Sequence, residues 1–217
     1  MSLADSQVPA PVVNQVRAHL LCSECECRFS RLGEDWVMRQ VWNGKQFPLL
    51  ERLNVAVETR CTADMLIYSG SSIGIDTEKL AYFALSVLWR AGVREWTTSK
   101  DSRFHVALGE HEEILRHYLQ GETAFPANVS VMVTVCSDIY SRVFHMPTPA
   151  TFPISVTAFA MLALGLHFLV FLGPLAPQQI CCVRFPMKVI SRRDCGHKMI
   201  EAFAQLNSIR SEWGLQP

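Results

Sequence analysis

The stretch that decides the fold is Ile154-Ser-Val-Thr-Ala-Phe-Ala-Met-Leu-Ala-Leu-Gly-Leu-His-Phe-Leu-Val-Phe-Leu-Gly-Pro-Leu-Ala176. It lies inside a longer segment, between Arg142 and Arg184, that contains no Lys, Arg, Asp or Glu. An apolar segment of this length has two interpretations. It is long enough to cross a bilayer of about 30 Å as a helix, and it can equally fold inside a domain as a buried β-hairpin.

The ends and the middle of this stretch favour the hairpin. Pro153 and Pro174 bracket it, Gly165 lies midway, and its Phe and Val residues suit strands. Neither end carries the Lys/Arg cluster that orients a spanning helix, and no Trp or Tyr belt marks an interface. We therefore expect two strands that meet near Gly165 and bury both faces.

Other segments predict an α+β fold around the hairpin. Val129–Val135 alternates Val with other residues, which predicts a strand beside the hairpin. Asp76 is a candidate N-cap for a strongly apolar helix that ends near Gly92. A second helix is expected over Glu110–Gln120, and Gly121 stops it.

The order of these elements predicts how the chain is organised. Residues 1–16 are expected to be a loose lead-in, and residues 17–217 a single α+β domain. Within it, a knuckle and helices (17–121) precede a part that contains a small antiparallel sheet (122–196), and a C-terminal helix (197–213) closes the chain.

The amino-acid composition limits the classes of function that the chain can have. The 20 Lys+Arg balance the 20 Asp+Glu, so no basic field draws nucleic acid to the chain. Hydrophobic residues make up 49% of the 217 residues, which requires a large core, a partner or a membrane. The eight cysteines lie mostly in apolar runs and no cleavable signal peptide begins the sequence, which favours a reducing cytoplasm. We expect four of them to be core residues: Cys61, Cys136, Cys181 and Cys182.

The strongest local motif is a C-x-x-C pair. Residues 20–27 read Leu-Leu-Cys-Ser-Glu-Cys-Glu-Cys, and a helical apolar pattern follows directly. Cys22 from the turn and Cys25 from the first helical turn can reach one zinc ion, since the positive end of a helix dipole favours thiolate. Tetrahedral zinc needs four ligands, and this knuckle supplies two.

These residues resemble a known family. The segment from Leu20 to Glu26, followed by Phe29 and Gly33-Glu34, and the segment Phe83-Ala-Leu-Ser-Val-Leu-Trp-Arg-Ala91 are similar to a bacterial family of uncharacterised proteins with a degenerate HNH-type treble-clef knuckle. The resemblance implies that Cys22 and Cys25 are metal ligands and that Glu26 is a knuckle residue. It also implies an upstream C-x-x-C and a Ser-His segment, and this chain has neither.

The other half of the site would need ligands from elsewhere in the sequence. Cys27 is close, but three clustered thiolates rarely share one tetrahedron. Cys195 and His197 are the best distant candidates, and the simpler interpretation is that they are ordinary loop and helix-start residues. The knuckle cysteines can likewise be a plain turn that packs into the core.

Three functions follow from these observations. The first is a non-catalytic interaction or structural protein built on a relic HNH-like zinc knuckle, with a protein partner or a homo-oligomer. The second is a metal-dependent HNH-type nuclease that a partner or an upstream segment completes. The third is a membrane-attached protein.

Overall fold

A computed structural model describes residues 20–41, 45–56, 60–61, 66–68, 73–97, 103–136, 144–150, 157–173 and 181–184. The lead-in and the closing helix expected from the sequence lie outside these residues, as do Cys195 and His197.

The apolar stretch forms a β-hairpin. Strand β7 (Thr157–Ala163) pairs antiparallel with β8 (Leu166–Leu172), and Ala163 stands opposite Leu166. Leu164 and Gly165 make the turn with φ of 46° and 91°, the positive φ values that a tight two-residue hairpin turn requires. The hairpin prediction is confirmed for residues 157–173. None of the helices in the described part of the chain is both long and apolar enough to cross a bilayer.

The hairpin lies in a larger sheet than the small antiparallel one expected from the sequence. Among the described residues the sheet has seven strands in the order β1-β2-β9-β5-β8-β7-β6. Strand β5 pairs antiparallel with β8 as expected, with Val133 opposite Phe168. The pair β5–β9 is parallel, whereas every other pair is antiparallel. The bounds of the remaining strands are β1 (Arg60–Cys61), β2 (Leu66–Tyr68), β5 (Val129–Val135), β6 (Phe144–Ala150) and β9 (Cys181–Arg184).

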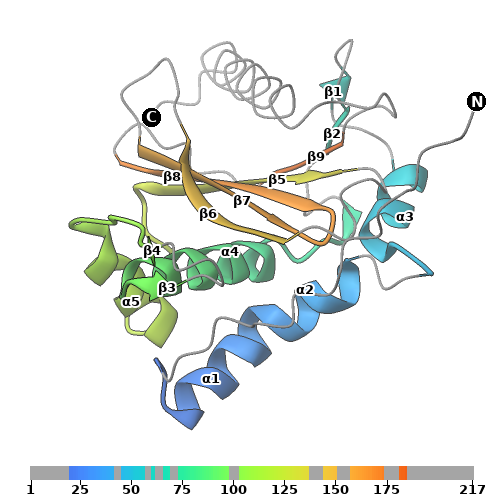
Figure 1. Cartoon of the computed structure of the whole chain (residues 1–217). Coiled ribbons are helices and arrows are strands. Elements are labelled where there is room, and N and C mark those ends of the chain that lie inside the picture. Colours follow the sequence, from blue (N-terminus) through green and yellow to red (C-terminus); the bar gives the residue numbers. More distant parts are fainter. Residues whose placement is uncertain are drawn as a thin grey trace, which may run out of the picture.

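Helix α4 (Thr77–Gly92) runs along one face of the sheet (Figure 1). It begins as predicted, because the Asp76 carboxylate accepts a hydrogen bond from the Lys79 N–H at 3.0 Å. The ring centroids of Phe83 and Phe168 are 5.5 Å apart and join α4 to β8. Leu169 and Phe171 point to the other face of β8 and are also buried, so the central hairpin strand buries both faces.

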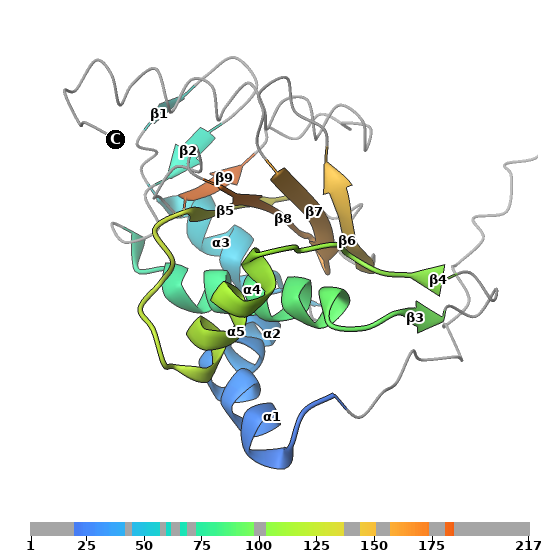
Figure 2. The ribbon, with the colours of Figure 1, turned by 90° about the vertical axis from the view of Figure 1, so that its left-hand side faces the viewer.

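The remaining helices lie on the same side of the sheet as α4 (Figures 1 and 2). Three segments follow one another without a break and make one helix over residues 23–40, which we call the N-terminal helix. They are α1 (Ser23–Phe29), the π-helical η1 (Ser30–Glu34) and α2 (Asp35–Gln40). The others are α3 (Pro48–Val55) and α5 (His111–Gln120), and a separate two-stranded sheet joins β3 (Trp96–Thr97) to β4 (Arg103–Phe104).

Helices on one side of a mainly antiparallel sheet make this an α+β fold, as the sequence predicted. Most apolar side chains of the described residues are buried in the core. Among the described residues, the large apolar side chains that remain exposed are Met38, Val55 and Phe144, which lie on three different elements.

Candidate metal centre

Cys22 and Cys25 lie at the start of the N-terminal helix. Cys22 is the N-cap residue, with extended backbone (φ −73°, ψ 163°), and its carbonyl accepts the Glu26 N–H at 3.0 Å. Cys25 lies in the first turn. The Cys22 side chain is exposed and that of Cys25 is half-buried, and both thiols are free. The sequence therefore placed the pair correctly, with one cysteine before the helix and the other inside it.

Hydrogen bonds between Cys22 and Cys25 set the direction of both pKa values. The pKa of Cys22 is lowered, chiefly because the backbone N–H of Cys25 faces its sulfur and then because the Cys25 thiol donates to it. The pKa of Cys25 is raised, first because its proton is held in that hydrogen bond to Cys22. Cys22 consequently loses its proton at a lower pH than Cys25 does.

Polar residues surround the pair without completing a metal site. Glu24, Glu26 and Cys27 share its turn of the helix and are exposed. In the part of the chain that the structure describes, no group of three or more His, Cys, Asp or Glu side chains is placed to hold a metal ion. The assignment of Cys22 and Cys25 as zinc ligands therefore stays a prediction, and the pair would supply two of the four ligands that tetrahedral zinc needs.

The N-terminal helix is held on α4 by an aromatic cluster. The Phe29 ring meets the Tyr82 ring edge-on at 5.8 Å and the Trp89 ring at 6.2 Å. The Tyr82 hydroxyl donates to the Leu119 carbonyl at 2.7 Å, which ties α4 to α5. Burial raises the pKa of Tyr82 to about 12, so the hydroxyl keeps its proton for this bond. These contacts hold the N-terminal helix against α4 at Phe29, one turn after Cys25.

The two segments that carry the resemblance to HNH-type proteins touch each other. Glu34 forms an ion pair with Arg90, whose guanidinium also lies 5.7 Å from the centre of the Phe29 ring. A Cβ atom on Gly33 would stand 3.0 Å from the Phe83 nitrogen. These residues therefore have a packing role: they dock the N-terminal helix on α4 and so aim the cysteine pair outward. The sequence showed both segments but not that they are neighbours.

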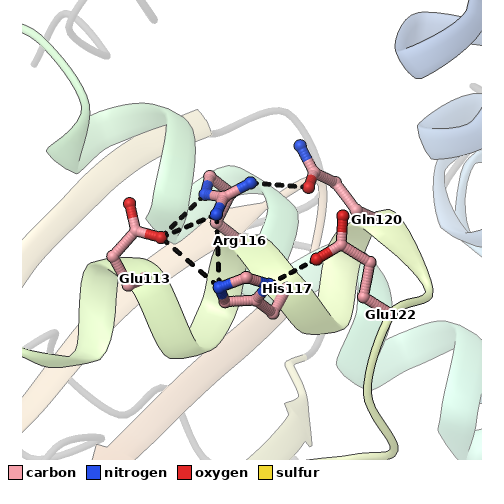
Figure 3. A network of polar contacts seen from close by, with 5 residues as sticks. All are labelled: Glu113, Arg116, His117, Gln120 and Glu122. Atoms are coloured by element: carbon pink, nitrogen blue, oxygen red, sulfur yellow. Dashed lines mark hydrogen bonds and ion pairs between the residues drawn. The ribbon is translucent and has the colours of Figure 1, made fainter.

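Side chains of α5 and of Glu122, just after it, form a polar network (Figure 3). Arg116 donates to Glu113 at 2.9 Å and to Gln120 at 2.7 Å, and His117 pairs with Glu122. The hydrogen bond from Arg116 lowers the pKa of Glu113. Because these half-buried and exposed groups bond to one another, the network stabilises the end of α5.

No family model, curated protein or solved structure matches this chain. The resemblance to HNH-type proteins consequently remains a prediction from the sequence. Of the four cysteines expected in the core, Cys136 is buried as predicted. The side chains of Cys61, Cys181 and Cys182 lie outside the described residues, so their burial stays a prediction.

Proposed function

We propose that this chain is a non-catalytic interaction protein whose Cys22–Cys25 pair binds zinc as half of a site that another polypeptide completes. One observation carries the proposal: Cys22 and Cys25 are free thiols at the start of the N-terminal helix, the Cys25 thiol donates to Cys22, and no group of three or more ligands forms there among the described residues. Zinc with two protein ligands keeps two positions for incoming ligands, so a second polypeptide with thiolate or imidazole groups can bind there.

The docking contacts support an interaction role. Phe29, Gly33 and Glu34 fix the helix that carries the cysteines to α4. A zinc-mediated contact needs ligands that are held in place. Ordering a mobile ligand pair costs conformational entropy, and this cost lowers the affinity for zinc. The free thiols also fit the proposed location, the reducing cytoplasm, where thiolates stay available for metal.

Metal analysis of the purified full chain tests the proposal. We expect zinc below one ion per chain, readily removed by a chelator, because two thiolates alone leave a labile site. Cys22→Ser and Cys25→Ser should each abolish the bound zinc. Cys27→Ser is the matched control: it removes an exposed thiol next to the pair and should retain the zinc. One tightly held zinc per chain in a monomer would contradict the proposal, and its loss in Cys195→Ser or His197→Asn would identify the ligands within the chain.

A further inference from the structure

We infer that the polypeptide that completes the site is a second copy of this chain, so that one zinc ion is held by Cys22 and Cys25 of each of two copies. This rests on the proposed half-site and names its partner. Two C-x-x-C pairs related by a two-fold axis supply four thiolates, the ligand number that structural zinc requires. No ligand beyond the pair seen in the structure is then needed.

The position of the pair allows two copies to approach. The first turn of α1 lies at the end of the molecule away from the sheet, in both views of the chain (Figures 1 and 2). Cys22 is exposed there, and its neighbours Ser23 and Glu24 are exposed as well. A zinc ion on the two sulfur atoms would therefore face outward, where the same turn of another molecule can meet it.

The helix dipoles at this end favour the arrangement, whereas the exposed Glu24 carboxylate beside each pair opposes it. Zinc with four thiolates carries a net charge of about −2. In each copy, Cys22 and Cys25 lie at the positive end of the dipole of the N-terminal helix. Two such dipole ends therefore stabilise the negative charge of the zinc site. The chain as a whole has a formal net charge of +0, and two copies consequently do not repel each other at long range.

The rest of the described surface indicates that such a dimer depends on its metal. The exposed large apolar residues, Met38, Val55 and Phe144, belong to α2, α3 and β6. Three exposed apolar residues are too few to form the buried centre of a stable interface. Zinc is then the main link, and its removal should return the protein to the monomer.

The test is the mass of the full chain in solution, measured by light scattering on a sizing column with reductant present. Without metal we expect a monomer. With added zinc we expect a dimer that contains about 0.5 zinc per chain and dissociates on chelation. Cys22→Ser and Cys25→Ser should remain monomeric with zinc, and Cys27→Ser should dimerise like the parent. Circular dichroism of each variant checks that the exposed substitution leaves the fold intact.

The other outcomes separate the two proposals. A monomer that binds zinc weakly through Cys22 and Cys25 would overturn the second-copy inference and leave the half-site standing. A chain that binds no zinc at any concentration would overturn both. A dimer that forms equally in chelator, or that disappears only when reductant is added, would show that the copies associate without zinc, which also overturns the inference.

Discussion

Gly33 lies against the backbone of Phe83, and this close approach joins the helix that carries the cysteine pair to the helix that covers the sheet. A Cβ atom at position 33 would stand 3.0 Å from the Phe83 nitrogen and 3.1 Å from its Cα. Backbone atoms of α4 cannot move aside as a flexible side chain would. The absence of a side chain at Gly33 is therefore what lets Phe29 reach Trp89 and Glu34 reach Arg90.

Gly33→Ala should destabilise the protein by about 1–3 kcal/mol, because the two helices must separate to admit the methyl group. Ala is otherwise the better helix former, so at an open position the same change would raise stability. Urea unfolding measures the difference. Arg31→Ala, at an exposed position of the same helix, is the control and should change stability by less than about 0.5 kcal/mol. A more stable Gly33→Ala protein would show that the two helices are not in this contact.

Phe168→Asp should unfold the domain. The Phe168 side chain is 0% exposed at the centre of the sheet, and an unpaired carboxylate there costs several kcal/mol. Thr157→Asp places the same charge at an exposed position of the same hairpin, and we expect it to fold normally. Circular dichroism and solubility distinguish the two variants. A folded Phe168→Asp protein would mean that this face of the hairpin reaches water.

In the metal-free protein Cys22 should be alkylated faster than Cys25, and the difference should grow as the pH is lowered. The lowered pKa of Cys22 keeps its thiolate present at a pH at which Cys25, with its raised pKa, is fully protonated. Fragmentation mass spectrometry after iodoacetamide treatment locates each label. Cys25→Ala removes the thiol that donates to Cys22, so the pKa of Cys22 should rise toward its ordinary value. Faster labelling of Cys25 across the pH range would reverse the assignment of the two roles.

The chain alone should not cleave DNA when magnesium, manganese or zinc is added. The sequence has no histidine placed before the knuckle to activate water, apart from His19, which is too close to Cys22 for that role. A net charge of +0 also gives no general attraction to phosphates. A plasmid-nicking assay measures this directly. Cleavage that disappears in Cys22→Ser would establish the nuclease instead.

The sequence predicted those elements that residues within a short stretch of chain determine, such as helix caps and tight turns. Asp76 begins α4 through its own hydrogen bond, and Gly121 ends α5 with a φ of 76°. The hairpin followed from Gly165 and the apolar runs on either side of it. The spacing of Cys22 and Cys25 likewise predicted a pair at a helix start, since both residues belong to one turn of chain.

Elements that depend on distant partners were not predicted. Strand β6 contains Pro147 and Pro149, which argue against a strand, yet it lies at the edge of the sheet, where a missing N–H is tolerated. The parallel pairing of β5 with β9 joins residues far apart in the sequence. The contact between Gly33 and Phe83 was not predicted either, because neither segment of the sequence indicates that the other lies beside it.

The number and kind of ligands around bound zinc test the central claim most directly. X-ray absorption at the zinc edge of the zinc-loaded full chain measures both. Two copies that share one ion predict four sulfur ligands at about 2.3 Å, with about 0.5 zinc per chain in the same sample. Two sulfur ligands together with two nitrogen or oxygen ligands at about 2.0–2.1 Å, or one zinc per chain, would contradict it.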